Sequence, residues 1–254
     1  FFISDNSLGI VDLMNQIVDI NPLVIGLTCF NSNYYLVKLI AKKLKIYFPK
    51  IKLVIGGPSA TFSDLLIMKD CPEIDLCVRR EGEETTFQLI NNFKKDSNAL
   101  DLIEGITFRK NKKIIQNRDR VFLGLNIKNG LDIFPSPFIE GIINPAQMLR
   151  VNKEVSFLTS RGCTCKCTYC NFASMSQFTV RHHSIERSIA ELKIIKDAGV
   201  NWVSIQDDTF TLHRKQAQEL CKAIINQKLG LNFWLLTRSD TLDKGFLKLL
   251  YKAG

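Results

Sequence analysis

The sequence predicts an α/β protein with two regions of parallel sheet. On both sides of residues 100–150, short β-branched apolar runs alternate with amphipathic helical patterns, and this alternation is typical of βαβ units. The intervening residues break the rhythm and are rich in loops and prolines. We therefore expect an α/β domain over 1–99, a linker with a small β-hairpin over 100–150, and a parallel (βα) barrel or open sheet over 151–254.

Hydrophobic periodicity predicts the elements of the first region. Residues 23–28 form a continuous β-branched run, which is typical of a strand buried on both faces. The helix expected over 34–48 ends at Pro49, because proline cannot continue a helix. Altogether we expect a strand tail at 1–4, strands at 23–28, 52–55 and 74–78, and helices at 8–20, 34–48, 62–68 and 83–94.

The remainder of the chain predicts a hairpin and three strand–helix units. Residues 105–109 and 113–115 form the hairpin, with Asn111 at its turn. Ser184 is a suitable N-cap, and Gly199 a suitable C′ residue, for a long helix between them. The strands are expected at 155–159, 202–205 and 232–236, and the helices that follow them at 185–198, 214–227 and 242–253.

Composition excludes several classes of protein. Of the 254 residues, 46% are apolar and 23% are charged, which is ordinary for a globular protein and excludes intrinsic disorder. No apolar run approaches the roughly 18 residues that a transmembrane helix needs. The net charge is +9, but Lys and Arg are scattered rather than clustered on one element, so we expect neither nucleic acid nor a membrane as a partner.

Cysteine usage indicates metal ligation in a reducing compartment. Eight cysteines are present, and four of them lie within eight residues. A chain of this length with an ordinary core does not need disulfide staples. We therefore expect a cytoplasmic protein whose crowded thiols hold a metal.

The crowded thiols follow an expected strand, and Cys163, Cys167 and Cys170 have the spacing C-x3-C-x2-C. Three thiolates on a tight loop suit three irons of a 4Fe–4S cube and leave the fourth iron open to a small chelating molecule. Loops that follow strands carry the chemistry in parallel α/β proteins. We interpret the three cysteines as ligands of a 4Fe–4S cluster.

Other interpretations of these residues remain. A zinc site would need a second cysteine or histidine pair at a suitable distance, and only the adjacent His182 and His183 follow the loop. Buried or redox-active thiols are another alternative. Cys165 is either a fourth ligand or a bystander. The two adjacent histidines and the lone His213 are more typical of surface positions than of catalysis.

The segment 161–170 (RGCTCKCTYC) resembles the cluster loop of the radical S-adenosylmethionine (SAM) superfamily. The resemblance implies that SAM chelates the open iron. One electron from the reduced cluster then cleaves SAM to methionine and a 5′-deoxyadenosyl radical, which abstracts hydrogen from an unactivated C–H bond. It also implies Tyr169 as a SAM contact and an electron donor such as flavodoxin or ferredoxin. Thr164 and Cys165 depart from the usual loop, at positions that are not ligands in the family.

Two further strand ends would serve SAM in such an enzyme. In relatives, the strand end occupied here by Asp207 and Asp208 contacts the amino group of SAM, and carboxylates suit an ammonium. Alternatively, Asp208 or Thr209 caps the following helix. Arg238 ends the next expected strand and would bind the SAM carboxylate or a substrate anion, or it is an ordinary ion-pair residue.

The first region resembles the Rossmann-like (flavodoxin-like) cobalamin-binding domain that precedes many radical SAM domains. The resemblance rests on residues 23–28, 56–61 and 80–85 and on the linker segment 133–137. It implies that cobalamin lies against the strand ends. Alternatively, the domain has kept this fold and lost its cofactor. The residues that the resemblance assigns to cobalamin are Thr28, Gly56, Gly57, Glu81, Gly82 and Glu83.

Together the two resemblances imply a cobalamin-dependent radical SAM enzyme. Its commonest reaction in relatives is methylation of an unactivated carbon or phosphorus centre, here of a small-molecule or peptide substrate. Radical cyclisation or rearrangement, without methyl transfer, is an alternative. A protein that only binds or senses cobalamin or an iron–sulfur cluster is an alternative of another class.

The resemblance also bears on the length of the chain. The family barrel has six βα units, of which three are expected here, and the cobalamin domain usually begins with a strand and a helix that would precede Phe1. We therefore expect the 254 residues to be part of a longer protein, with a partial barrel and both ends truncated. Exposed apolar sheet edges would make this piece poorly soluble alone.

Overall fold

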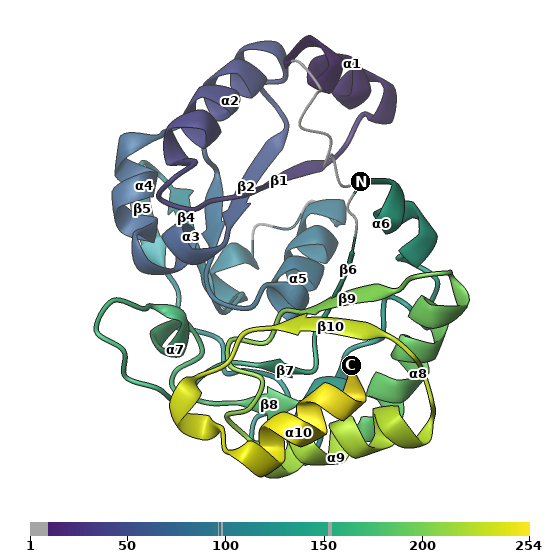
Figure 1. Ribbon diagram of the computed structural model, residues 1–254. Coiled ribbons are helices and arrows are strands. Elements are labelled where there is room, and N and C mark those ends of the chain that lie inside the picture. Colours follow the sequence, from purple (N-terminus) through teal and green to yellow (C-terminus); the bar gives the residue numbers. More distant parts are fainter. Residues whose placement is uncertain (1–9, 96, 98, 152–153) are drawn as a thin grey trace. The chain divides into compact units, whose positions relative to one another are not determined.

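The chain folds as two compact units that divide between Arg120 and Val121 (Figure 1). The region boundaries expected after residues 99 and 150 stay predictions. The strand tail expected at 1–4 lies outside the described residues. The computed structural model describes residues 10–95, 97, 99–151 and 154–254.

The first unit is a mixed five-stranded sheet. The first three strands run parallel, and a hairpin extends the sheet in the antiparallel sense. In spatial order the strands are β1 (Val24–Thr28), β2 (Lys52–Gly56), β3 (Leu76–Val78), β4 (Ile106–Lys110) and β5 (Lys113–Gln116). The helices are α1 (Ile10–Ile20), α2 (Tyr34–Tyr47), α3 (Pro58–Phe62), α4 (Asp64–Asp70) and α5 (Glu83–Lys94), with a 3₁₀ turn η1 (Ala99–Leu102).

Alternate residues of the central strands face two different cores, because successive side chains of a strand point to opposite faces. Leu53 and Ile55 of β2 belong to a core shared with helices α1 to α4. Val54 between them belongs to a second core with Leu89 of α5 and Phe108 of β4. Helices therefore cover both faces of this sheet, as the strand–helix alternation predicts.

Strand β1 differs from its prediction. Residues 23–28 were expected to be buried on both faces, but every side chain of β1 is half-buried or exposed. The reason is its place in the sheet: β1 is the outermost of the described strands, and β2 is the one described strand that pairs with it.

The helix expected over 62–68 is in fact two helices, α3 and α4. Pro58, whose fixed φ suits the first turn of a helix, starts α3 four residues before the expected start. At Ser63 the backbone leaves the helical region, with φ −134° and ψ 21°, and α4 begins at the next residue. Apolar spacing alone did not reveal this break.

The hairpin forms where the sequence predicts it and belongs to the first sheet rather than to a free linker. Asn111 and Lys112 at its turn have φ values of 50° and 64°, the left-handed pair typical of a two-residue hairpin loop. Ile106 and Phe108 of β4 are almost fully buried. Burial of these two side chains explains why β4 pairs with β3.

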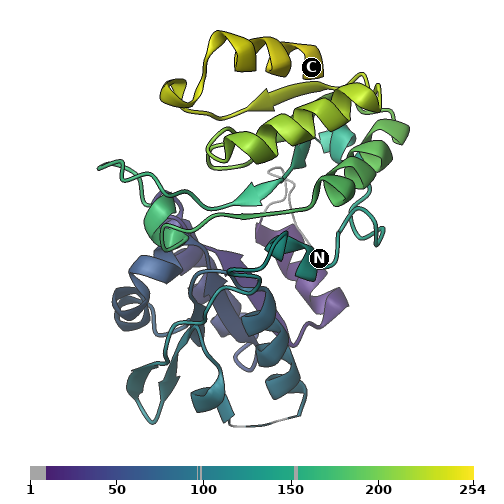
Figure 2. The same cartoon turned by 90° about the horizontal axis from the view of Figure 1, so that it is seen from below.

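The second unit contains the three predicted strand–helix units. Its sheet is parallel in the order β10 (Asn232–Leu235), β9 (Trp202–Ile205), β6 (Val155–Phe157). The helices α10 (Lys244–Ala253), α9 (Arg214–Asn226) and α8 (Ile185–Asp197) follow the same order, with α9 packed between the other two (Figure 2). The shorter elements are η2 (Gly130–Ile133), α6 (Pro145–Val151), β7 (Ser160–Arg161), α7 (Phe172–Met175), β8 (Arg181–His182) and η3 (Ser239–Thr241).

The predicted ends of α8 are confirmed. The Ser184 side chain accepts a hydrogen bond from the backbone N–H of Arg187, as an N-cap does. Gly199 has φ 82°, the left-handed conformation expected just past a helix end.

Among the described residues, none of the helices combines the length and the apolar composition that crossing a membrane requires.

Candidate functional site

The predicted cobalamin residues gather at one edge of the first sheet. Thr28 ends β1 and pairs in register with Gly56, which ends β2. Residues 81–83 follow β3, the next strand in the sheet, and Gly82 precedes the first turn of α5. Ligands of open parallel sheets bind at this carboxyl edge. The structure therefore brings together residues that lie more than fifty positions apart in the sequence.

Gly57 is required at this edge. Its φ is 93°, and a Cβ there would lie 3.0 Å from the carbonyl oxygen of Cys29 and 3.2 Å from Thr28 Oγ1. A Cβ on the neighbouring Gly56 would meet no atom within 4 Å. The double glycine thus turns the chain tightly against β1 and leaves open space beside the end of β2.

Polar side chains that the sequence did not single out hold the loops of this edge. Asn33 Nδ2 donates to the carbonyl of Thr28 at 3.1 Å, and Ser59 Oγ donates to Asn31 Oδ1 at 2.9 Å. Thr61 Oγ1 accepts from the backbone N–H of Arg80 at 2.8 Å and so joins the loop after β2 to the loop after β3. Ser59 and Thr61 lie within the segment 56–61 on which the resemblance rests, whereas Asn31 and Asn33 were marked in the sequence only by their position just after a strand.

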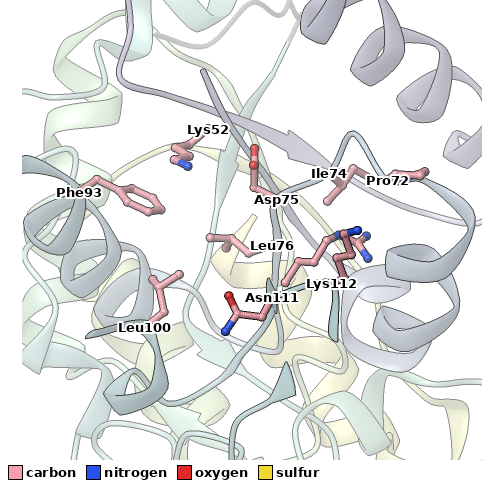
Figure 3. A pocket seen from close by; sticks show the side chains of 10 residues that line it. Lys52, Pro72, Ile74, Asp75, Leu76, Phe93, Leu100, Asn111 and Lys112 are labelled. Carbon is pink, nitrogen blue, oxygen red and sulfur yellow. The ribbon is translucent and has the colours of Figure 1, made fainter. Parts of the chain in front are cut away.

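A pocket of the first unit lies at the opposite, amino end of the strands (Figure 3). Its cavity of about 280 Å³ is lined by Lys52 at the start of β2, Leu76 at the start of β3, and the cations Arg109 and Lys112. The one carboxylate in it, Asp75, already accepts from Lys45 Nζ at 2.7 Å and from a backbone N–H at 2.8 Å. None of the predicted site residues lines this pocket.

In the second unit, a short ladder closes the cysteine loop. Ser160 pairs with His182, and Arg161 with Arg181, so that β7 and β8 bring the two ends of residues 162–180 together. Gly162 begins the loop with φ 100°. A Cβ at this position would lie 2.1 Å from the carbonyl oxygen of Thr179. The loop can therefore close only with glycine there.

Asp207, at the end of β9, holds the approach to the loop. Asp207 is 1% exposed, and its carboxylate accepts four hydrogen bonds. The donors are Thr159 N and Ser160 N at 2.7 and 3.0 Å, and the hydroxyls of Thr159 and Ser160 at 2.5 and 2.6 Å. Burial raises the pKa of Asp207, and these hydrogen bonds oppose that rise. Both oxygens thus bind the chain that leads from β6 into the cysteine loop.

Asp208 and Thr209 continue this support. The Asp208 carboxylate accepts from the backbone N–H of Gly162, and burial raises the pKa of this side chain. Thr209 Oγ1 lies 3.9 Å from Cys163 Sγ. Neither residue caps the next helix, because α9 begins at Arg214 with His213 before it. The capping alternative is therefore wrong, and the end of β9 is tied to the loop.

The three predicted cluster ligands differ in exposure. Cys163 is 8% exposed, Cys167 is half-buried and Cys170 is exposed. Cys163 Sγ accepts from the backbone N–H of Cys165 at 3.4 Å. The thiol of Cys165 is half-buried, and burial raises its pKa. Within the described part of the chain, no three His, Cys, Asp or Glu side chains converge as ligands of a single metal ion.

Arg238 reaches the cysteine loop from the end of β10. Its Nη1 donates to Cys167 Sγ at 3.2 Å. Its Nε and Nη2 donate to the two oxygens of Asp240 at 3.0 and 2.6 Å, and this pairing raises the pKa of Arg238. The ion pair considered as an alternative is therefore present, together with a sulfur contact that the sequence did not predict. Tyr169, the other predicted SAM contact of the loop, is 92% exposed.

The histidines fall into two groups. His183 is buried and its Nδ1 lies 3.1 Å from Asp132 Oδ1, so the expectation of a surface position is wrong for it. It follows β8, and its backbone N–H donates to the carbonyl oxygen of Thr159 at 2.9 Å. His182 is partly buried, and its ring lies edge-to-face on that of His213, with centroids 4.5 Å apart. His213 itself is exposed, as expected.

Comparisons with known proteins find the same two domains. The family model described as B12 binding domain matches residues 3–90. The family model described as radical SAM superfamily matches residues 157–254, a stretch that includes the whole cysteine loop.

Curated relatives cover almost the whole chain. An uncharacterized methyltransferase of Pyrococcus horikoshii is 30% identical over 247 residues, which are 96% of this chain and 52% of the relative. The anaerobic magnesium-protoporphyrin IX monomethyl ester cyclase of a Synechocystis species is 27% identical over 237 residues, which are 91% of this chain and 46% of the relative. The chain spans about half the length of the curated relatives it matches.

A solved structure shares the fold of both units. The radical S-adenosylmethionine methyltransferase TsrM from Kitasatospora setae, with tryptophan and a SAM analog bound, superposes with a TM-score of 0.77 at 15% identity. The match covers 96% of this chain and 49% of that one. A second structure of TsrM, with cobalamin and a 4Fe–4S cluster bound, gives a TM-score of 0.74. The chain belongs to the radical SAM superfamily, among the members that carry a B12-binding domain.

Proposed function

We propose that the protein is a cobalamin-dependent radical SAM enzyme that methylates an unactivated carbon or phosphorus centre. The observation that carries the proposal is the attachment of the cysteine loop to the end of β9 by Asp207 and Asp208. A loop built this way holds three thiols at the carboxyl edge of a parallel sheet, where α/β proteins place their chemistry.

The donor set fits a 4Fe–4S cluster better than a single ion. In a cubane each cysteine binds a different iron, so the three sulfurs need not converge on one point. Cys163, Cys167 and Cys170 would hold the cluster. When bound together, the cluster and SAM supply a 5′-deoxyadenosyl radical. The second unit contributes the closed loop, with Gly162 at its start and the β7–β8 ladder at its base.

We propose separate tasks for the residues that the resemblance assigns to SAM. Asp208 accepts one described backbone hydrogen bond and has acceptor capacity left for the ammonium of SAM. Asp207 would act indirectly, because four donors of the chain occupy its carboxylate. The exposed Tyr169 lies next to the ligand Cys170 and would contact SAM from the loop.

The carboxyl edge of the first sheet fits cobalamin. Gly56 leaves open space beside β2, and Gly57 keeps the loop close to β1. Thr28 and the segment 81–83 supply hydroxyl, carboxylate and backbone groups from the neighbouring strand ends, and such groups can pair with the amides of a corrin. Bound cobalamin supplies a cobalt centre that can carry a methyl group.

Methyl transfer is favoured over the alternatives by the relatives. The match of highest identity reported above is named as a methyltransferase, and so is TsrM. The Synechocystis relative keeps radical cyclisation as the second candidate. We further propose a small-molecule or peptide substrate, a flavodoxin- or ferredoxin-like electron donor, and a cytoplasmic location.

Anaerobic incubation of the cluster-loaded, cobalamin-loaded protein with SAM and a reductant tests the proposal. We expect 5′-deoxyadenosine from the radical step and S-adenosylhomocysteine from the methyl-donor step. Cys170→Ala should abolish 5′-deoxyadenosine, whereas Cys221→Ala, a buried cysteine of α9 outside the loop, should not. 5′-Deoxyadenosine without S-adenosylhomocysteine would favour cyclisation. The absence of both products from loaded protein would favour a binding or sensor protein.

Cobalamin binding has its own test. After anaerobic reconstitution, the protein should retain a corrinoid absorption band through gel filtration. Gly57→Val should lose this band, because its Cβ would press against Cys29 and Thr28. A parent protein without any corrinoid band would show that the domain has kept the fold and lost the cofactor.

A further inference from the structure

We propose that Arg238, oriented by Asp240, is a positioning residue of the cluster, which fixes the thiolate of Cys167 and stabilises the reduced cluster. This inference rests on the proposed function in one respect, the 4Fe–4S cluster on the three cysteines. It differs from the role that the sequence suggests for Arg238, which is to bind the carboxylate of SAM.

The geometry of the guanidinium carries the inference. Nη1 donates to Cys167 Sγ at 3.2 Å, within hydrogen-bond distance of a sulfur acceptor. Nε and Nη2 form a fork on the two oxygens of Asp240 at 3.0 and 2.6 Å. All three nitrogens of the planar group are therefore in use, and its orientation is fixed by a bidentate carboxylate pair. Asp240 therefore already occupies the Nε–Nη2 edge of the guanidinium, which a SAM carboxylate would need for a bidentate pair of its own.

The position in the fold makes the contact specific. Arg238 follows β10, and Cys167 belongs to the loop after β6 and β7, which is 71 residues away in the sequence. Because β10, β9 and β6 are parallel neighbours, their carboxyl ends meet at one edge, and a long side chain can span it. Cys163, by contrast, has the neutral backbone N–H of Cys165 as its donor. The cationic donor is thus directed to Cys167.

The chemistry follows from charge. Reduction adds one electron to a cluster that already carries three thiolates, so any fixed positive charge or N–H donor at a ligand sulfur stabilises the reduced form. Arg238 supplies both. The Asp240 carboxylate lowers the net charge of the pair but holds the donor in place. Removing Arg238 should therefore make the cluster harder to reduce.

The test is a redox titration of the full chain with its reconstituted cluster, in the absence of SAM. Iron and sulfide content are measured first, and the reduced cluster is followed by electron paramagnetic resonance. We expect the midpoint potential of Arg238→Gln to be more negative than that of the parent. Arg238→Lys keeps the charge but loses the fork, and should shift the same way by a smaller amount.

Arg214→Gln is the matched control. Arg214 also lies in the second unit, pairs with an aspartate (Asp243) and has similar side-chain exposure, 43% against 38% for Arg238. It stacks on Phe246 and contacts Thr241, and no sulfur is among its described contacts. The midpoint potential of the cluster in Arg214→Gln should equal that in the parent protein.

Each outcome decides the inference. An unchanged midpoint in Arg238→Gln would overturn it, and weaker SAM binding in the same variant would return Arg238 to the SAM carboxylate. Loss of iron from Arg238→Gln, with circular dichroism unchanged and iron retained by Arg214→Gln, would support it. If Arg238→Gln does not fold, an unchanged midpoint in Arg238→Lys would overturn it. Failure of the parent to form 5′-deoxyadenosine would count against the proposed function alone, since the titration contains no SAM.

Discussion

At the scale of single residues, the cysteine loop depends on groups that are not its ligands. Gly162 allows the loop to close, and Asp207 collects the four donors that fix its approach. Of the cysteines proposed as ligands, Cys167 is half-buried and Cys170 is exposed. We therefore expect the residues around the loop to control cluster retention as strongly as the cysteines do.

Gly162→Ala should lose the cluster and destabilise the protein. A non-glycine residue with positive φ costs about 1–2 kcal/mol, and the clash of the new Cβ with Thr179 adds to that. Iron content and urea unfolding measure the two effects. Gly199→Ala is the control, because Gly199 has φ 82° but open space around it. The free energy of unfolding of Gly199→Ala should fall by only about 1 kcal/mol, and this variant should keep its iron. Equal effects of the two substitutions would contradict the steric argument.

Asp207→Asn should destabilise the second unit by roughly 2–4 kcal/mol, because the amide places a donor against the N–H and O–H groups that now donate to the carboxylate. Urea unfolding of the metal-free protein measures the change. Asp197→Asn, at the exposed end of α8, is the control and should change the free energy of unfolding by less than about 0.5 kcal/mol. If the free energy of unfolding of Asp207→Asn fell by less than about 1 kcal/mol, the stabilising role of the buried hydrogen bonds would be contradicted.

At the scale of elements, the ladder between β7 and β8 joins the cysteine loop to the histidine pair. Ser160 of β7 donates to Asp207, and its ladder partner is His182. The ring of His182 is buried at Nε2, which has no hydrogen-bond partner, and packs on His213. A charge on this ring would have little compensation, so the ladder should be sensitive to protonation.

This predicts a pH dependence of stability. Burial, followed by the neighbouring His213 and His183, lowers the pKa of His182 from 6.5 to about 4. Between these two values the unfolded chain binds a proton that the folded chain does not, so the free energy of unfolding should fall as the pH drops from 6.5 to 4. His182→Gln should flatten the curve over this window. Urea midpoints at several pH values measure it, and identical slopes in both proteins would refute the assignment.

At the scale of the whole molecule, each unit has its own core. The first unit buries side chains on both faces of a mixed sheet, and the second buries them between a parallel sheet and the helices α8, α9 and α10. Each unit also carries one predicted cofactor edge, cobalamin in the first and the cluster in the second. Damage to one core should therefore act on one cofactor.

Phe108→Ala tests this separation. Phe108 is 1% exposed in the core of the first unit. Truncation of this side chain should lower the free energy of unfolding by about 3–5 kcal/mol. Corrinoid retention should fall while iron content stays at the parent value. Phe87→Ala, at a side chain 63% exposed on α5 of the same unit, should change neither property. Loss of iron in Phe108→Ala would show that the two units depend on each other.

Much of the fold was predictable, because local patterns determine it. The helix over 83–94 begins and ends where its periodicity does, and the caps at Ser184 and Gly199 are as expected. The break at Ser63 and the exposure of β1 were not predictable, since one depends on an early helix start and the other on the place of a strand in its sheet.

The chemical groups can be identified from the amino-acid order alone: three cysteines at cluster spacing, a double glycine after a strand, and carboxylates and an arginine at successive strand ends. The contacts of these groups depend on how the chain folds in three dimensions. Asp207 binds residues 47 and 48 positions away, and Arg238 binds a sulfur 71 positions away. Periodicity and capping act within a few residues, whereas such contacts arise from the order and register of parallel strands, so no local pattern predicts them.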